Sequence, residues 1–209
     1  MITFRHHIFP VLPALIFTLS AASCIGTKNA ECGFSAKELE LLNGSDTIMR
    51  VLTIDNPADE AVLRAKSSDL SDEYEKLAEL MVATVTHPSQ DGVGIAGPQV
   101  GLNRRVVAVQ RFDKEPVEWN GRIDHPFEVY PNVRILWASD SLAAGPEGCL
   151  SVPNRRENVM RAQEIVIEYA SIDTEEKVTM VKDTIKGFTA VIFQHEIDHL
   201  DGLLYIDRI

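Results

Sequence analysis

The sequence predicts an α+β fold with a mostly antiparallel sheet, and three observations lead to this prediction. Apolar residues recur at helical spacing over residues 70–86. Segments rich in β-branched residues follow, and a second helical pattern occupies residues 186–200. Strands that lie between two helices are typical of the α+β class.

The first helix, predicted over residues 70–86, has both a start and a stop signal. Asp69 or Ser71 can cap its N-terminus, acidic residues crowd its first turn, and His87 followed by Pro88 ends it. Its apolar stripe indicates packing against a hydrophobic core and requires no ligand.

Strands are predicted next over residues 105–110 and 129–136, which are apolar and β-branched. Residues 164–169 and 177–182 alternate in polarity on either side of a turn at residues 173–176, a pattern that predicts a β-hairpin. No internal repeat or low-complexity segment interrupts this order of elements.

The composition excludes several classes of protein. The 209 residues accommodate one domain comfortably, and 45% hydrophobic with 24% charged residues is typical of a folded globular chain. The net charge of −11 argues against binding to nucleic acid or anionic lipid, because no basic excess is available to neutralise phosphates. Three cysteines are too few for a fold that depends on disulfides.

Residues 1–24 are laid out like an export signal. A basic start, with Arg5 and no acid, precedes an apolar run over residues 8–19 and several small residues. Cys24 follows them, as in the lipobox of bacterial lipoproteins, although Ala21 stands where that motif usually has leucine. The apolar run is too short for a comfortable transmembrane helix. We therefore expect an exported protein that is attached to the bacterial membrane through a lipidated Cys24.

Three alternatives to this predicted location and membrane attachment stay open. Residues 1–24 could form a buried N-terminal helix, which Pro10 and Pro13 disfavour. The protein could be exported without a lipid, in which case Cys24 and Cys32 could pair, or it could be cytoplasmic. Outside that pairing, Cys32 has no assigned role.

The chain divides into three segments on this interpretation. The signal-like segment covers residues 1–24, and a polar tether with one short helix around residues 36–42 covers residues 25–45. A single folded domain covers residues 46–209 and carries the acidic excess.

The last helix, predicted over residues 186–200 with Gly202 as its stop signal, carries the sharpest chemical pattern. His195, Glu196 and His199 form an H-E-x-x-H motif. On a helix the two histidines lie about 40° apart, so both imidazoles can reach one metal ion. Glu196 can then reach a water at that ion as a general base. The alternative is a solvated polar face, but the flanking apolar residues would bury this helix, and buried polar side chains need partners.

A catalytic metal commonly has three protein ligands and one open position, so the two histidines need a third partner. Downstream of His199 only Asp201 and Asp207 offer carboxylates, and Asp201 is sterically awkward so close in the sequence. Upstream, Cys149 follows Gly148, a residue that permits close backbone approach. Cys149 is therefore the candidate, with an inert buried thiol as the alternative.

A third stretch, residues 92–99, combines small residues with Gln99. It lacks the Lys-Ser/Thr ending of a nucleotide-binding P-loop and the glycine spacing of a dinucleotide-binding motif. We expect it to form a cleft wall for an extended peptide, with the Gln99 amide available to a developing oxyanion. A plain tight turn is the alternative.

Together the three stretches resemble one family, the peptide deformylases. That family carries G-x-G-x-A-A-x-Q, E-G-C-L-S and Q-H-E-x-D-H-L-x-G motifs in this order, and the chain has them at residues 92–99, 147–151 and 194–202. The second and third match fully, whereas Gly97 replaces the second alanine of the first. Since the chain also has a stretch similar to the family's opening P-x-x-x-L-R, the resemblance covers residues 46–209.

The resemblance implies a fold in which antiparallel sheets pack around a central metal-binding helix. Cys149, His195 and His199 would bind one divalent metal ion, usually Fe²⁺ in that family, with Zn²⁺ as the alternative because the donor set suits both. Glu196 would take a proton as a metal-bound water attacks the formyl carbon of a formyl-methionyl peptide. It would then deliver that proton to the leaving amine, which releases formate.

The remaining roles implied by the resemblance concern the substrate. The Gln99 side chain and the Leu150 backbone N–H would stabilise the oxyanion. The cleft would be apolar enough for a methionine side chain, with Ile95 and Ile192 as candidate walls and Gly94 as a further substrate-binding candidate. The partner would be the N-terminus of a formylated peptide or nascent chain, bound by a monomer. Two alternatives are an exported metallopeptidase that cuts ordinary peptide bonds and a non-catalytic peptide-binding lipoprotein of the same fold.

Overall fold

The computed structural model describes residues 34–70, 74–119, 122–172 and 178–209. Within these ranges, helices combine with strands that pair in the antiparallel sense, so the predicted α+β class is confirmed. None of the described helices is long and apolar enough to cross a membrane. The signal-like segment, residues 1–24, and Cys32 lie outside the described residues.

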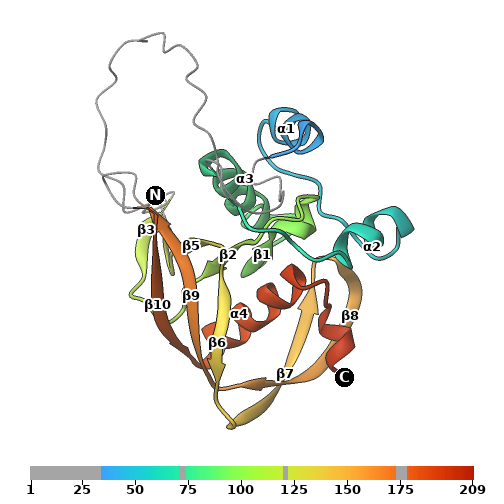
Figure 1. Ribbon diagram of the computed structural model, residues 1–209. Coiled ribbons are helices and arrows are strands. Elements are labelled where there is room, and N and C mark those ends of the chain that lie inside the picture. Colours follow the sequence, from blue (N-terminus) through green and yellow to red (C-terminus); the bar gives the residue numbers. More distant parts are fainter. Residues whose placement is uncertain (1–33, 71–73, 120–121, 173–177) are drawn as a thin grey trace, which may run out of the picture.

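Three helices come first in the chain and occupy the upper part of Figure 1: α1 (Ala36–Asn43), α2 (Pro57–Leu63) and α3 (Glu75–Val85). The short helix expected around residues 36–42 is confirmed as α1. Asn56 caps α2 by accepting a hydrogen bond from the backbone N–H of Ala58 at 2.9 Å. Pro57 occupies the first helical position, where a missing N–H costs nothing.

The helix expected over residues 70–86 is shorter than predicted. α3 begins at Glu75, with Tyr74 in the N-cap position, so Asp69 does not cap it. Asp69 instead accepts a hydrogen bond from Arg134, and Ser71 lies outside the described residues. The apolar stripe of α3 is buried, as expected.

Part of the segment expected to be a tether packs against the domain. Leu42 of α1 is buried in a hydrophobic cluster that also contains residues of α3. The buried Arg104 donates two hydrogen bonds to Glu38 of α1, each at 2.7 Å. The helix at the end of residues 25–45 is therefore docked by an ion pair as well as by apolar contact.

The first sheet has the order β1-β2-β5, formed by β1 (Gly94–Ala96), β2 (Val106–Gln110) and β5 (Phe127–Pro131). β2 confirms the strand expected over residues 105–110, and all its residues are buried. The short helix η1 (Gly97–Val100) follows β1 directly. A separate hairpin pairs β3 (Val117–Trp119) with β4 (Arg122–Asp124).

The second sheet has the order β10-β9-β6, formed by β6 (Arg134–Ala138), β9 (Glu164–Ile172) and β10 (Val178–Lys186). The expected hairpin is confirmed by the β9–β10 pairing, while its turn lies outside the described residues. The single strand expected over residues 129–136 is wrong, because the chain breaks between β5 and β6 at Asn132, where φ is 55°. The Asn132 side chain pairs with both the N–H and the C=O of Leu70, at 2.7 and 2.8 Å.

A long hairpin and a central helix complete the fold. The hairpin pairs β7 (Leu142–Cys149) with β8 (Val152–Ala162). The helix α4 (Gly187–Leu200) confirms the one predicted over residues 186–200, and η2 (Tyr205–Arg208) follows it. Gly202 is at φ 76°, and a Cβ there would lie 2.3 Å from the carbonyl oxygen of Arg64, so only glycine fits.

The helix α4 runs through the middle of the molecule, as the resemblance implied (Figure 1). Its buried apolar side chains join those of β2, β9 and β10 in one hydrophobic cluster. The core therefore surrounds the helix that carries the H-E-x-x-H motif.

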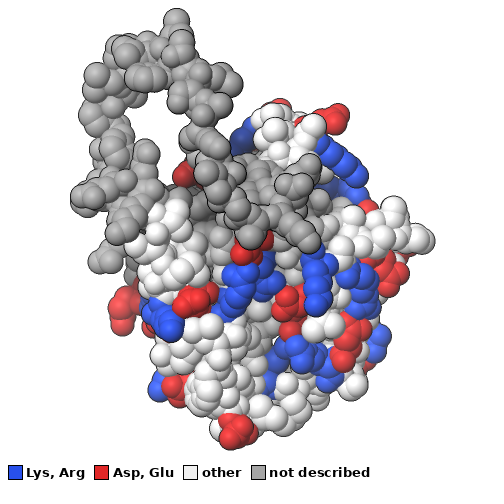
Figure 2. Space-filling view, in the orientation of Figure 1, with Lys and Arg blue, Asp and Glu red and all other residues white. Residues whose placement is uncertain are grey.

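Acidic and basic side chains are intermingled on the face shown in Figure 2, where no broad basic surface is visible.

Candidate metal centre and cleft

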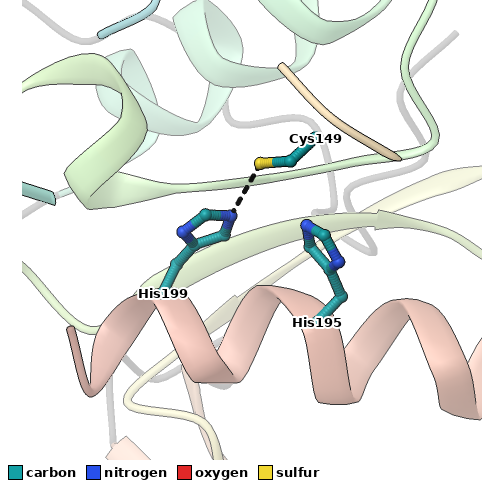
Figure 3. Close-up of side chains that lie close together, drawn as sticks. All are labelled: Cys149, His195 and His199. Carbon is teal, nitrogen blue, oxygen red and sulfur yellow. Dashed lines mark hydrogen bonds between the residues drawn. The ribbon is translucent and has the colours of Figure 1, made fainter. Parts of the chain in front are cut away.

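A cysteine and two histidines meet beside the central helix. His195 and His199 lie one turn apart and project from the same side of α4 toward Cys149, the last residue of β7 (Figure 3). One donor atom from each residue lies within 4.8 Å of the other two, and Cys149 Sγ is 3.2 Å from His199 Nε2. The β7–β8 register shifts between Gly148 and Cys149, and such a bulge re-aims the side chain that follows it.

Glu147 fixes the orientation of His195. Its Oε2 lies 2.8 Å from Nδ1 of His195, and both side chains are buried. Burial opposes ionisation, but hydrogen bonds from His195 and Arg161 outweigh it and lower the pKa of Glu147 to about 2. Because an ionised carboxylate only accepts hydrogen bonds, Nδ1 of His195 carries the proton and Nε2 is left for the metal site.

A chain of buried ion pairs holds Glu147 in place. Arg161 on β8 donates to the two oxygens of Glu147 at 2.7 and 3.0 Å, and to Asp198 on α4 at 2.6 Å. Asp198 also accepts a hydrogen bond from Arg208 of η2 at 3.1 Å. Arg161 thus ties the strand that ends at Cys149 to the helix that carries the histidines.

The donor set fits a divalent transition metal. One thiolate and two imidazoles are ligands that Zn²⁺ and Fe²⁺ both accept. Burial and the neighbouring His195 hold the pKa of His199 well below its usual range, so its imidazole is neutral, as a ligand must be. Burial would lower the pKa of His195 too, but Cys149 and Glu147 outweigh it and raise that pKa. These partners favour a positive charge at this position, and a bound cation would supply one.

Glu196 lies next to these donors, at the floor of a cleft. Its side chain is buried, and Oε2 has no hydrogen-bond partner among the described residues. Burial raises the pKa of Glu196 to about 7. Gly94 makes room for it, because a Cβ at that position would lie 2.5 Å from Oε1 of Glu196. A carboxyl group with this pKa can accept and return a proton near neutral pH.

Gln99 reaches the same site from η1. Its Oε1 accepts a hydrogen bond from the backbone N–H of Ala96 at 2.8 Å, which fixes the direction of the amide. The Nε2 end then lies 3.5 Å from Cys149 Sγ and 3.3 Å from the hydroxyl of Ser151. An N–H donor held rigidly beside the metal ligands is the arrangement that stabilises a developing oxyanion.

The site opens into a cleft of about 690 Å³. Of the residues predicted from the sequence, the cleft is lined by Gly94, Gln99, Cys149, Leu150, Ile192, His195 and Glu196. The expectation that Ile95 contacts the substrate is wrong, because its side chain is fully buried in the cluster that contains α3. Alternate residues of a strand face opposite sides, so Gly94 and Ala96 face α4 while Ile95 faces α3.

Sequence reasoning missed several residues of the cleft. Phe188 and Val191 line it together with Ile192, and Arg156 lies at its rim. The helical spacing of residues 188, 191, 192 and 195 places them on one side of α4, and this signal could have identified the apolar wall.

The fold and the site define a class of protein. It is an α+β protein in which one cysteine and two histidines form a transition-metal centre, with a buried carboxyl group and a fixed amide beside it. A family model described as polypeptide deformylase matches residues 48–209. The chain therefore belongs to the polypeptide deformylase family, which is metal-dependent.

Individual relatives agree with this assignment. Peptide deformylase 2 of Gloeobacter violaceus is 40% identical over 151 residues, which cover 71% of this chain and 74% of that protein. A peptide deformylase of Leptospira biflexa is 33% identical, with 78% of this chain and 88% of that protein covered. A class I type b peptide deformylase from Acinetobacter baumannii, solved with Met-Ala-Ser bound, has a TM-score of 0.65 and 31% identity, covering 79% of this chain and 100% of that chain.

Proposed function

We propose that this protein is a peptide deformylase, a metal-dependent hydrolase that removes the formyl group from formyl-methionyl peptides and releases formate. Its membership of the polypeptide deformylase family supports this function. The observation that carries it is the position of Glu196, a buried carboxyl group with an unpaired oxygen, close to the cluster of three metal donors.

Cys149, His195 and His199 would hold one divalent metal ion. When bound, such an ion lowers the pKa of a water molecule and polarises the carbonyl of the substrate. The family resemblance favours Fe²⁺, while the donor set suits Zn²⁺ equally. Metal analysis of protein purified under anaerobic conditions distinguishes them: we expect one iron per chain, and one zinc per chain would contradict that choice.

Glu196 acts as the acid–base group in this proposal. Its carboxylate accepts a proton from the water that attacks the formyl carbon, and a tetrahedral centre forms there. The same carboxyl group then protonates the amine as the C–N bond breaks, so formate and a free N-terminus leave. The pKa of Glu196, about 7, allows both transfers near neutral pH.

The tetrahedral centre carries a negative oxygen that needs hydrogen-bond donors. The Gln99 side chain is one, because its amide is fixed with Nε2 toward the site. The backbone N–H of Leu150, a cleft residue that directly follows Cys149, is the second. Removing one such donor typically lowers kcat by about 10²–10³-fold.

The apolar wall of the cleft suits a methionine side chain. Phe188, Val191 and Ile192 line it from α4, on the same helix as the metal donors. Gly94 also lines the cleft, and its missing side chain leaves room for the carboxyl group of Glu196. The substrate of this proposal is therefore a formylated N-terminus whose first side chain is long and apolar.

A comparison of blocked peptides tests the proposed function. The full chain, loaded with Fe²⁺ under anaerobic conditions, is expected to hydrolyse a formyl-Met peptide far faster than the acetyl-Met peptide or the internal bonds of an unblocked peptide. Comparable rates on all three would favour a general metallopeptidase. Binding of the peptides without release of any product would favour a non-catalytic peptide-binding protein.

For the location of the protein we propose export and lipid attachment at Cys24, which rests on the sequence pattern of residues 1–24. Labelling cells with a radioactive fatty acid tests this. We expect label on the wild-type chain and none on the Cys24→Ala variant. Label that persists in the variant would contradict the proposal, and a chain without any label would also do so.

A further inference from the structure

Arg156 lies at the rim of the cleft, directly across the β7–β8 hairpin from the metal site. It pairs in register with Gly148, the residue that precedes Cys149. The Cγ and Nε atoms of Arg156 lie 3.3 and 3.5 Å from the position that a Cβ of Gly148 would occupy. The side chain of Arg156 therefore rests on the bare backbone of Gly148, close to a metal ligand.

Among the described residues, neither a hydrogen bond nor an ion pair engages the guanidinium of Arg156. The side chain is nevertheless exposed and lines the cleft. Its neighbour Arg155 differs, because the Nε of Arg155 lies 3.1 Å from a carboxylate oxygen of Glu157. The buried Arg161, which has a structural role, is paired twice.

The acidic groups that line the same cleft leave this positive charge uncompensated. Glu147 is engaged by Arg161 and His195. Glu196 is buried at the floor of the cleft and forms no ion pair with Arg156. Asp91 lies on the cleft wall without an ion pair to Arg156.

We propose that Arg156 selects formyl-methionyl peptides that carry a carboxylate group beyond the first residue. The inference rests on the proposed function, which places the formyl group at the metal donors and the methionine side chain along α4. The rest of the peptide then leaves through the mouth of the cleft, where Arg156 lies. A guanidinium pairs with a carboxylate through two parallel hydrogen bonds, which a neutral amide cannot match.

The carboxylate has two sources: the free C-terminus of a short peptide, or an acidic side chain within a longer one. Peptides rise about 3.3 Å per residue when extended, so a group two or three residues beyond the formyl end is within reach of the rim. Free short peptides supply the first source, and longer chains supply the second. The two sources share one chemistry and are separated by the choice of peptide.

Three formylated tripeptides compare these sources on the full chain loaded with Fe²⁺. The first is formyl-Met-Ala-Ser with a free C-terminus, the second is its C-terminal amide, and the third is formyl-Met-Ala-Glu amide. We expect kcat/KM for the first peptide to exceed kcat/KM for the second by about three- to tenfold, mainly through a lower KM. At high salt, which screens the ion pair, the two values are expected to become similar. A similar advantage for the third peptide identifies an acidic side chain as a source, and its absence restricts the source to the free C-terminus.

Two variants identify the residue responsible. In Arg156→Gln the ratio of acid to amide is expected to fall to about one, whereas Arg155→Gln, its matched neighbour, keeps most of the ratio. Equal kcat/KM for the first two peptides in the wild type, or a ratio that survives in Arg156→Gln, would overturn the inference.

The absence of deformylase activity can be distinguished from the absence of a role for Arg156. If no peptide releases formate, calorimetric binding of Met-Ala-Ser and its amide still tests the role of Arg156. Preference for the acid that disappears in Arg156→Gln supports it, and equal affinities reject it.

Discussion

The Nδ1 atom of His195 lies 2.8 Å from Oε2 of Glu147, a carboxylate two residues before the cysteine of the metal site. This contact joins the strand β7 to the helix α4 at the point where their donors converge. It also sets the tautomer of His195, because Glu147 is ionised and can only accept. One contact therefore both positions a metal ligand and prepares it for binding.

Replacing Glu147 with glutamine is expected to weaken metal binding. The variant loses the negative charge that orients His195, and Arg161 loses one of its two buried carboxylate partners. Changes of this kind beside a metal ligand typically cost about 10- to 100-fold in affinity. Competition with a chelator measures the dissociation constant.

Glu157 offers a matched control for this change. It pairs in register with Glu147 across the hairpin, but its only ion pair among the described residues is with the exposed Arg155. Glu157→Gln is expected to bind metal like the wild type. Equal affinity in the Glu147→Gln variant and the wild type would show that this carboxylate does not support the site.

Replacing Gly94 with alanine is expected to displace the carboxyl group of Glu196. The new methyl group would lie 2.5 Å from Oε1 and 2.9 Å from Cγ of Glu196, so that side chain has to move. A shift of about 1 Å in a catalytic group can lower kcat by about 10²-fold. Formate release, with metal content measured on the same sample, gives the result.

Gly145→Ala is the control, because a Cβ at Gly145 meets no atom within 4 Å. That variant is expected to keep its kcat. If Gly94→Ala keeps its kcat as well, this result would contradict the expectation that the position of the Glu196 carboxyl group controls the rate.

The ion pair between Glu38 and Arg104 is expected to make stability depend on pH. The hydrogen bond from Arg104 lowers the pKa of Glu38 to about 2 in the folded chain, from its usual value of 4.5. A lowered carboxyl pKa stabilises the fold above pH 4.5 and loses this contribution as the pH falls toward 2. For a pair at the edge of the domain we expect about 1 kcal/mol at neutral pH, since solvent screens part of the interaction.

The Glu38→Gln variant isolates this charge, because glutamine can still take part in the helix cap that Glu38 forms with Ser35. Its free energy of unfolding is compared with that of the wild type between pH 7 and pH 3, without metal in either sample. The difference is expected to shrink on acidification. A difference that stays constant over this range would contradict the ion-pair explanation.

The central helix and its motif could be predicted from the sequence because the patterns that indicate them are local. His195, Glu196 and His199 fall within one helical turn, and the surrounding apolar residues predict burial. The hairpin β7–β8 was not predicted, because Gly145, Pro146 and Gly148 within β7 are residues that usually indicate turns. Their pairing with β8 depends on contacts that no local pattern carries.

The network of ion pairs around the metal site could not be predicted from the sequence, for a similar reason. Glu147, Arg161 and Asp198 lie far apart in the sequence and meet only when β7, β8 and α4 pack together. Ile95 was misplaced because the face of a three-residue strand depends on which helix covers which side. The sequence pattern contains no such information.

The structure also explains why the chain has glycine at position 97, where the family motif has alanine. From sequence, glycine in place of alanine only loosens the backbone. In the fold, a Cβ at Gly97 would lie 2.7 Å from the carbonyl oxygen of Arg104 and 2.8 Å from that of Leu102. Glycine is therefore required by the close approach of this loop, which carries the arginine that holds α1.

The most direct test of the central claim compares the wild type with Glu196→Gln at equal metal content. Because Glu196 moves the proton but is not one of the three metal donors, the variant should bind metal normally. Formate release from a formyl-Met peptide is expected to fall by about 10²–10⁴-fold. Release at the wild-type rate by the metal-loaded variant would contradict the role of Glu196 and, with it, the proposed mechanism.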